Sequence, residues 1–567
     1  MVTVSEAIAD ELASRTDVVF GVMGNGNAHV VSRLTSRGIR YVSARHEGGA
    51  LAMADAYYRA SGRMAVATTT YGPGFTNTLT ALGEATQARV PILFVTGDAP
   101  STGARPVDID QKKICEAIGV EVVTVTSDAP RGSVRAAWAL AQTTRRPVVL
   151  AIPYDFATAQ APDEEAETAV RAPLPQEPPA QEIDGLTAAL SSARRPLILV
   201  GRGAILAEAV ATIRAIGDRI GALFATSVMA RNAFDSPWDL GIAGGFARAR
   251  RLELIREADL VVTFGAALNT FQTREGHLFE NAADVIAVSL DPPARSGVAT
   301  HHLAFDARAV AEALLSSLES DASSEKNGWR AELDPQEWRI EALTPDADEG
   351  EFGPDGRLDP RRVARVLNEI LPAERTIAQD GGHFLGWMPM YASVPDPQGL
   401  IMSGTAFQVI GLGFPFGVGA ALAQPDRLAV LISGDGGGLM ALPDLETFIR
   451  VVPRGVVVVF NDAAYGAELH QYASRGLHPE AMLIDEVDFA AIGRSLGAEG
   501  VKARAISDLE PLRQWVESGS RGVFVLDVST SRAVVAAYMA EVVTEAASDE
   551  WRAEVTGLPT GASLGAS

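Results

Sequence analysis

Two aspartates each follow an apolar run and stand where a metal ion could be held. Asp435 lies in the stretch GDGGG after the run LAVLIS, and Asp462 follows VVVVFN, one strand–helix–strand unit further along. If both runs are neighbouring parallel strands, the two carboxylates reach the same edge of a sheet, where ligands of α/β proteins bind. With the Ala464 carbonyl they would supply the hard oxygen ligands that Mg²⁺ prefers, and Asn461 would orient the turn.

The glycines beside Asp435 suit a phosphate, because a glycine-rich turn that leads into a helix offers backbone N–H groups to an anion. A purely structural interpretation stays open, since Gly-Asp-Gly is common in turns and an Asn-Asp pair can cap a helix. The second glycine-rich turn, FGVMGNGNAHV, does not complete a dinucleotide-binding fingerprint, because its sixth position is His29.

The runs that position these aspartates belong to a repeating α/β pattern. Stretches such as PILFVTG, PLILVGRG and GVVVVFND alternate with longer helical patterns, which is typical of parallel strands buried on both faces. Two polar stretches, 158–182 and 319–359, are predicted to be linkers. The sequence therefore predicts an α/β protein with three doubly wound parallel-sheet domains and a flexible tail. The domains are expected at residues 1–157, 183–318 and 360–545, and the tail at 546–567.

The composition excludes several classes of partner. The chain has 567 residues, 48 of them basic and 71 acidic, which gives a formal net charge of −23. We therefore expect no nucleic acid and no membrane as partner, because both require basic patches. No apolar run reaches the roughly 18 residues that span a bilayer, and the start lacks a basic n-region. The single cysteine, Cys115, fits a reducing compartment, so we expect a cytoplasmic protein.

A further acidic residue begins a helix in the first segment. In IRYVSARHEGGALAMADAYYRASGR a strand is followed by Arg45, His46 and Glu47, and then by a helix with an apolar stripe that includes Ala50 and Tyr57. Glu47 lies on the face of this stripe. A carboxylate at this place either caps the helix or acts on a ligand, and the segment alone leaves both interpretations open.

The segment GDGGGLMALPDLETFIRVVPRGVVVVFND resembles the cofactor signature of the thiamine diphosphate enzymes, the superfamily of acetolactate synthase, pyruvate decarboxylase and pyruvate oxidase. In that signature Asn is commoner where this chain has Asp462. The resemblance implies thiamine diphosphate and Mg²⁺ as cofactors, with Asp435, Asp462 and Ala464 as metal ligands. In this domain it assigns cofactor contacts to Gly434, Asp435, Gly436, Gly437, Asp462, Tyr465 and Gly466.

The same resemblance assigns the partner half of the site. Glu47 matches the glutamate that hydrogen-bonds the cofactor's aminopyrimidine and so favours the imino form that takes the thiazolium C2 proton. The segment SGTAFQVIGLGFPFGVGAALA is similar to the one that supplies an apolar wedge, here Ile410, and a backbone carbonyl against the amine, here that of Gln408. Three further cofactor contacts are implied on the first domain, at Asn27, Gly72 and Asn77.

The substrate pocket is less defined by these motifs. In TTTYGPGFTN, Tyr71 stands where the family usually has a small residue. Gln111 matches a substrate-side glutamine of acetolactate synthase-like members, and Glu468 matches an active-site glutamate of pyruvate decarboxylase-like members, although both also fit plain surface residues. The catalytic candidates are therefore Glu47, Gln111 and Glu468, and the substrate-pocket candidates are Tyr71, His383, Phe384 and His470.

Several reactions remain open at this point. The first hypothesis is an acetolactate synthase-like enzyme that decarboxylates a 2-oxo acid and ligates the product to a second carbonyl compound. The second is a simple 2-oxo acid decarboxylase or acyloin lyase, and the third a 2-hydroxyacyl-CoA lyase or oxalyl-CoA decarboxylase. A non-catalytic relative is disfavoured by the presence of Glu47, Asp435 and Asp462. FAD is a further candidate cofactor without a specific motif, and the resemblance implies a homodimer or homotetramer with active sites between chains.

Overall fold

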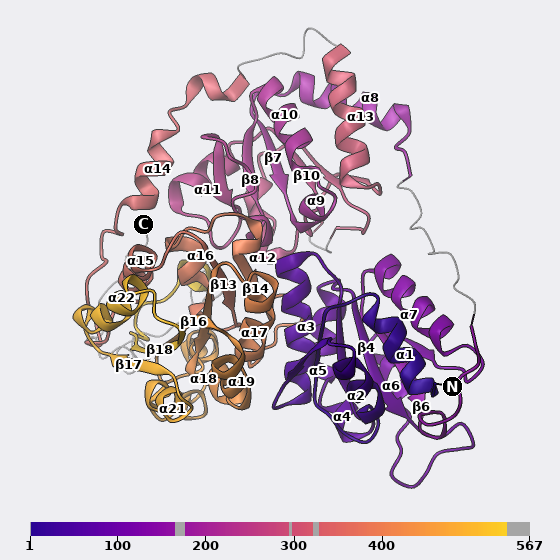
Figure 1. The fold of residues 1–567 in the computed structure, drawn as a ribbon. Helices are drawn as coiled ribbons and strands as arrows, with labels where there is room; N and C mark the ends of the chain where they lie inside the picture. Colours follow the sequence, from indigo (N-terminus) through magenta and orange to yellow (C-terminus); the bar gives the residue numbers. More distant parts are fainter. Residues whose placement is uncertain (1, 165–175, 294–296, 321–327, 541–567) are drawn as a thin grey trace.

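A computed structural model describes residues 2–164, 176–293, 297–320 and 328–540 of the chain; the predicted tail lies outside them. The described residues form three six-stranded parallel sheets, one in each predicted domain segment. Figure 1 shows the domain around β7 and β10 above the other two, which lie side by side below it. The predicted α/β class with three doubly wound parallel sheets is confirmed.

The first sheet has the strand order β2-β1-β3-β4-β6-β5. Residues along a strand alternate between two cores: Val19 packs on the side of α1 and α7, whereas Phe20 packs on the side of α3. The strands are β1 (Val18–Gly21), β2 (Arg40–Ser43), β3 (Ala65–Thr69), β4 (Ile92–Asp98), β5 (Glu121–Thr124) and β6 (Val148–Pro153). The helices are α1 (Val4–Ala13), α2 (Ala28–Ser36), α3 (Glu47–Ser61), α4 (Pro73–Thr76), α5 (Leu79–Gln87), α6 (Gln111–Ala117) and α7 (Pro130–Thr144).

The third sheet repeats the order of the first, β14-β13-β15-β16-β18-β17, so the two domains share one topology. Its strands are β13 (Arg375–Gln379), β14 (Leu400–Met402), β15 (Leu428–Gly434), β16 (Arg454–Asn461), β17 (Glu499–Ala503) and β18 (Gly522–Ser529). Its helices are α15 (Pro360–Ile370), α16 (Trp387–Tyr391), α17 (Gly413–Ala423), α18 (Asp435–Met440), α19 (Pro443–Val451), α20 (Gly466–Tyr472), α21 (Phe489–Ser495), α22 (Glu510–Glu517) and α23 (Ala537–Ala540).

The central sheet has a different order, β12-β11-β10-β7-β8-β9, in which β8 and β9 follow on one side of β7 and β10 to β12 follow on the other. This is the order of a dinucleotide-binding fold. Its strands are β7 (Pro196–Val200), β8 (Leu223–Thr226), β9 (Asp239–Ile242), β10 (Leu260–Phe264), β11 (Asp284–Val288) and β12 (His301–Leu303). Its helices are α8 (Ala180–Ser192), α9 (Arg202–Leu206), α10 (Val210–Ile220), α11 (Ala249–Arg256), α12 (Thr270–Thr273) and α13 (Ala307–Ser320).

The segment 319–359, predicted to be a linker, also contributes to the core of the central domain. It carries α14 (Gln336–Leu343), and the side chains of Trp329 and Trp338 are each only 1% exposed, packed in the cluster that covers one face of the central sheet. Two large aromatic side chains therefore anchor a stretch that otherwise reads as polar and acidic.

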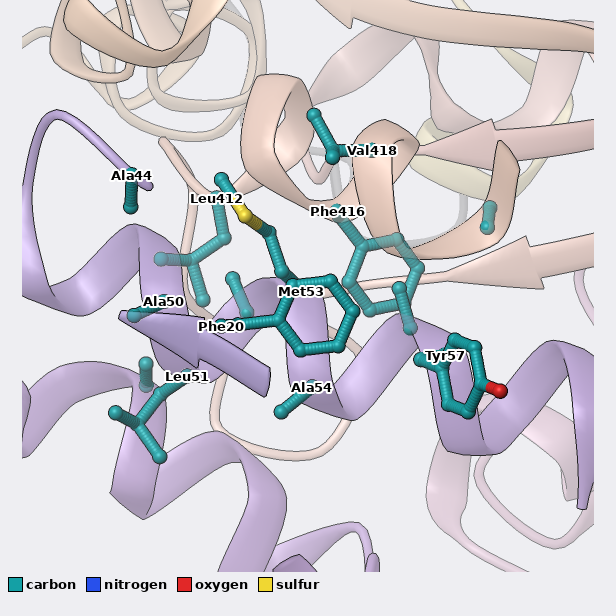
Figure 2. Close-up of a cluster of buried hydrophobic side chains, with 14 of the residues drawn as sticks. Phe20, Ala44, Ala50, Leu51, Met53, Ala54, Tyr57, Leu412, Phe416 and Val418 are labelled. Atoms are coloured by element: carbon teal, nitrogen blue, oxygen red, sulfur yellow. The ribbon is translucent and has the colours of Figure 1, made fainter. Parts of the chain in front are cut away.

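The first and third domains share one apolar core where α3 crosses α17. Met53, Phe416 and Leu412 interdigitate between the two helices (Figure 2). The backbones approach so closely that a Cβ on Gly419 would lie 2.0 Å from the carbonyl oxygen of Met53, so only glycine fits there. Because α3 is covered by its own sheet on one side and by α17 on the other, it is buried almost all round. This packing fixes the first and third domains relative to each other within one chain.

Candidate active site

The two aspartates of the expected metal site leave neighbouring strands at the carboxyl edge of the third sheet. β15 and β16 pair in parallel with Gly434 opposite Phe460, so that Asp435 and Asp462 follow at the same edge. Both side chains are buried. An oxygen of the Asp435 carboxylate accepts a 3.2 Å hydrogen bond from the N–H of Ala464, which fastens the turn after β16 to Asp435.

The electrostatics of this pair favour a bound cation. Burial raises the pKa of Asp435 to about 6, and burial together with the charge of Asp435 raises the pKa of Asp462 well above its usual value. Two buried carboxylates that oppose each other's ionisation are stabilised when a cation lies between them. Among the residues that the structure describes, no three His, Cys, Asp or Glu side chains form a metal-binding group. The donor set therefore fits a small divalent cation that completes its shell with a backbone carbonyl, ligand oxygens and water.

The turn after β16 is held in a strained conformation. Ala463 has a φ of +56°, in the left-handed region that costs a non-glycine residue about 1 kcal/mol. Asn461 supports the turn from behind, because its Nδ2 donates to an Asp527 carboxylate oxygen and to the Val487 carbonyl, both at 2.9 Å. As expected, Asn461 orients the turn, and the strain aims the N–H of Ala464 at Asp435.

The glycines that the resemblance assigns to the diphosphate lie in a tightly packed cradle. A Cβ on Gly436 would lie 2.6 Å from the Tyr465 ring, and one on Gly437 would lie 2.7 Å from an oxygen of Asp380. A Cβ on Gly466 would lie 2.7 Å from an Asp462 oxygen. Only backbone fits at these three positions, which leaves peptide groups as the lining beside Asp435, as a phosphate requires.

Asp380 belongs to this site although the sequence interpretation missed it. It follows β13 and is fully buried, and its carboxylate accepts hydrogen bonds from the N–H groups of Gly381 at 2.9 Å and Gly411 at 3.0 Å. Burial raises the pKa of Asp380 above its usual value. The signal was present in the sequence, because the stretch QDGGH places an Asp-Gly-Gly directly after a strand, as the GDGGG stretch does.

The loop between β14 and α17 carries Gln408 and the expected wedge, Ile410. Gln408 has a φ of +54°, and a Cβ on Gly381 would lie 3.2 Å from the Ile410 side chain. Ile410 therefore lies beside the end of β13, next to the glycine cradle. Glu84 of the first domain holds this loop, because one of its carboxylate oxygens accepts hydrogen bonds from the N–H groups of Phe407 at 2.8 Å and Ala406 at 3.3 Å.

Glu84 is itself part of a buried ionic network that sequence reasoning did not find. Arg59 on α3 pairs with Asp55 and, at 3.1 Å, with Glu84, and all three side chains are at most 4% exposed. Arg59 also donates to the Met402 carbonyl at 3.0 Å. The network joins α3 and α5 to the start and the middle of the loop that carries Ile410.

Glu47 is the first residue of α3 and lies at the carboxyl edge of the first sheet. The side chain of His46 caps the helix by accepting from the Gly48 N–H at 3.2 Å, so Glu47 is not needed as the cap. Instead, its carboxylate accepts a 2.9 Å hydrogen bond from the Asn77 side chain. Gly72, which begins the turn before Asn77, has a φ of +62° that favours glycine. The structure thus brings together Glu47, Gly72 and Asn77, as the resemblance implied.

Gln111 and Asn27 use their side chains to hold loops of the first domain. The Gln111 amide accepts from the Gly72 N–H and donates to the Gly97 carbonyl, both at 2.9 Å. Asn27 accepts from the Gly24 N–H at 2.8 Å and donates to Val22 and Thr68. Both residues are buried. Their amide groups therefore hold the loops that carry Gly24 and Gly72.

The pocket candidates of the third domain separate into two groups. His383, Phe384 and His470 are buried, with Phe384 stacked on Phe460 and the His383 and His470 rings 4.6 Å apart. Burial holds the pKa of both histidines below the usual value, with that of His470 at about 4. Glu468, on the first turn of α20, is instead exposed and has no hydrogen bond or ion pair within the described ranges.

In the described part of one chain, no hydrogen bond or ion pair links Glu47 to the Asp435–Asp462 pair. The two clusters belong to the carboxyl edges of different sheets.

In the central domain, the turn after β7 packs directly on the turn after β10, because the Gly203 N–H donates a hydrogen bond to the Gly265 carbonyl at 3.0 Å. The described residues also contain no helix that is long and apolar enough to cross a bilayer.

Comparisons with known proteins match a family domain to each of the three domains. Residues 2–114 match the thiamine pyrophosphate enzyme N-terminal TPP binding domain, residues 183–314 match the central domain, and residues 380–528 match the C-terminal TPP binding domain. The chain therefore belongs to the thiamine pyrophosphate enzyme family, which confirms the resemblance seen in the sequence. It is an enzyme with thiamine diphosphate-binding domains whose chemistry makes or breaks C–C bonds.

Relatives with named activities span most of the chain. A sulfoacetaldehyde acetyltransferase of Rhodobacter capsulatus is 30% identical, covering 89% of this chain and 90% of its own length. The acetolactate synthase large subunit of Parasynechococcus marenigrum is 28% identical, covering 88% and 82%. The structure of a thiamine diphosphate-dependent 4-hydroxybenzoylformate decarboxylase of Rhodococcus jostii RHA1 aligns with a TM-score of 0.77 at 20% identity, covering 94% of this chain and 99% of that one. At that identity the alignment supports the fold alone.

Proposed function

We propose that this enzyme uses thiamine diphosphate and Mg²⁺ to decarboxylate a 2-oxo acid and to join the product to a second carbonyl compound, as an acetolactate synthase does. The observation that carries the proposal is the buried Asp435–Asp462 pair on neighbouring strands, with the Ala464 turn fastened to it. The acetyltransferase and the acetolactate synthase at 30% and 28% identity support an acceptor step after the decarboxylation, whereas another relative at 28% identity is named a probable 2-ketoarginine decarboxylase.

The residues have separate tasks in this proposal. When bound, thiamine diphosphate supplies a carbon nucleophile for the 2-oxo carbon and a sink for the electrons of the leaving carboxylate. Asp435, Asp462 and the Ala464 carbonyl would hold Mg²⁺, and the neighbouring glycine cradle would take the diphosphate. Ile410 supports the cofactor, and the Glu47 carboxyl holds a proton on the pyrimidine ring nitrogen. The Asn77 side chain orients Glu47 through their 2.9 Å hydrogen bond.

The assignment also proposes how the two clusters meet. Glu47 lies on the edge of the first sheet and the Asp435–Asp462 pair on the edge of the third, without a bond between them in the described part of one chain. A homodimer, or a homotetramer made of dimers, would face the first domain of one copy with the third domain of another. Each active site would then take Glu47 from one chain and the metal site from its partner.

A simple decarboxylase is the second candidate, and Glu468 favours it. An exposed carboxyl at the first turn of α20, without a partner among the described residues, could give a proton to the carbon that remains after loss of CO₂. Protonation at that carbon releases an aldehyde and competes with attack on an acceptor. The two candidates therefore differ in whether the proton or the acceptor arrives first.

Product analysis tests the proposal. The purified protein is incubated with thiamine diphosphate, Mg²⁺ and ¹³C-labelled pyruvate or other 2-oxo acids, with and without an aldehyde or a second 2-oxo acid, and products are identified by NMR. We expect CO₂ release and a new C–C bond to the acceptor. Free aldehyde as the only product would favour the decarboxylase, and absence of CO₂ from every 2-oxo acid would overturn both.

A further inference from the structure

Four loops at the carboxyl edge of the first sheet bring together a polar and aromatic cluster that the cofactor site does not use. Asn25 follows β1, Tyr71 follows β3, Arg105 follows β4 and Tyr154 follows β6. The Tyr71 and Tyr154 rings meet edge to face at 6.0 Å. The Arg105 guanidinium lies 5.1 Å from the centre of the Tyr71 ring and 4.3 Å from that of Tyr154. The cluster is thus a cation held between two phenols.

Tyr71 is built into this edge. A Cβ on Gly26 or on Gly97 would lie 2.7 Å from the Tyr71 ring, so the ring rests on the bare backbone of two neighbouring loops. The next residue, Gly72, is held by Gln111 through a 2.9 Å hydrogen bond. A large phenol where the family usually has a small residue is therefore accommodated by specific glycines and is fixed in place.

The surroundings of the Tyr71 hydroxyl direct its hydrogen outward. The Thr70 hydroxyl donates to the Asn25 amide oxygen at 2.8 Å, which turns the Asn25 NH₂ group toward Tyr71, and this NH₂ donates to the phenol oxygen at 2.9 Å. The Arg105 guanidinium lies over the Tyr71 ring, 5.1 Å from its centre. With the Asn25 donor on its oxygen, Tyr71 still has its O–H to give, and among the described residues no acceptor for it is found.

Arg105 is held firmly enough to act on Tyr71. Asp108, whose side chain is 1% exposed, accepts from the Arg105 Nε at 3.0 Å and from its Nη2 at 2.8 Å. Hydrogen bonds to Asp108 raise the pKa of the guanidinium above its usual value, so it stays charged. For a phenol O–H beside a fixed cation, the best partner is an anionic oxygen.

The cluster extends along the sheet edge from Glu47. In the order β2-β1-β3-β4-β6, Glu47 follows the first of these strands and Tyr71 the third. At about 4.8 Å between neighbouring strands, β3 is about 10 Å from β2. A group that hydrogen-bonds Tyr71 would therefore lie along this edge from Glu47, on the side toward β4.

We propose that Tyr71, oriented by Arg105 and Asn25, donates a hydrogen bond to an anionic oxygen of the second substrate, the acceptor of the carboligation. The inference rests on the proposed function and deepens it, because it assigns the acceptor to the class of carboxylate-bearing carbonyl compounds. Tyr71 contacts this substrate directly, and Arg105 acts through Tyr71 as a positioning residue.

The test compares Tyr71→Phe with wild type on two acceptors of similar shape, 2-oxobutyrate and its neutral analogue 2,3-pentanedione, with pyruvate as donor. Phenylalanine keeps the ring on Gly26 and Gly97 and removes only the O–H. We expect the KM for 2-oxobutyrate to rise about tenfold, as expected for loss of one charge-assisted hydrogen bond, while the KM for the diketone and the rate of CO₂ release stay within about twofold. Tyr154→Phe is the matched control and should change neither KM.

Equal changes in the KM for both acceptors, or no change in either KM, would overturn the proposal. A wild-type enzyme that releases CO₂ and never ligates would overturn it too. A second readout separates failure of the role of Tyr71 from failure of the proposed function. Calorimetric titration with 2-hydroxybutyrate, which cannot be decarboxylated, requires no turnover. We expect the Kd to rise about tenfold in Tyr71→Phe and not in Tyr154→Phe, and an unchanged Kd would contradict the role of Tyr71 whatever reaction the enzyme performs.

Discussion

Replacing His470 with leucine should make the third domain less sensitive to acid. The His470 side chain is 2% exposed, and neither ring nitrogen has a hydrogen-bond partner among the described residues. Burial holds its pKa at about 4, whereas an unfolded histidine titrates near 6.5. Between these values the unfolded chain binds the extra proton and the folded chain does not. The free energy of unfolding therefore has its full value above pH 6.5 and falls as the pH decreases toward 4.

The size of the effect follows from these two pKa values. The linkage relation gives a loss of about 2 kcal/mol between pH 7 and pH 5 from His470 alone. Leucine has a similar volume and no proton to bind, so the variant lacks this loss. The assay is urea unfolding of both proteins at pH 7, 6 and 5, followed by tryptophan fluorescence. We expect the difference in unfolding free energy to shift in favour of His470→Leu by about 2 kcal/mol on going to pH 5. A difference that stays constant over this range would show that His470 titrates normally in the folded protein and would refute the reasoning.

Two other substitutions test the supports of the cofactor site. Glu84→Gln leaves one oxygen for the donors of Arg59, Phe407 and Ala406. We therefore expect a loss of about 3 kcal/mol in unfolding free energy and weaker thiamine diphosphate binding by calorimetry. Unchanged values of both quantities would contradict the role of the buried network. Asp462→Asn removes one of two opposed buried carboxylates and restores the residue that is commoner in the family. We expect retained Mg²⁺-dependent cofactor binding and a higher melting temperature in EDTA at pH 8, and abolished cofactor binding would show that the second carboxylate is essential.

The strands β15, β16 and β18 were predictable from sequence because they are continuous apolar runs, whereas β13 is equally buried but carries Arg375 and Gln379 and was missed. The edge strands β5, β12 and β17 have exposed residues and no such run. An edge strand is paired on one side only and does not need apolar side chains on both faces. The packing of Trp329 and Trp338 was likewise hidden, because two buried aromatics in a polar stretch create no period.

The candidate site was predictable where one residue type at a strand end carries the chemistry. Asp435 and Asp462 could be placed together because parallel strands of one sheet end at one edge. The roles of Gln111 and Glu84 could not, because they depend on which backbone groups from distant segments reach their side chains. Local sequence patterns do not contain that information. A glutamine that contacts a substrate and a glutamine that holds a loop therefore look alike in the sequence.

The central claim is that Glu47 of the first domain activates a cofactor held at Asp435 and Asp462. The most direct test is the rate of hydrogen–deuterium exchange at C2 of bound thiamine diphosphate, measured by acid quench and NMR in wild type and in Glu47→Gln. We predict exchange at least about 100-fold slower in the variant, with thiamine diphosphate affinity unchanged, because the proton on the pyrimidine nitrogen is lost while the metal site remains. Equal exchange rates in the two proteins would contradict the account.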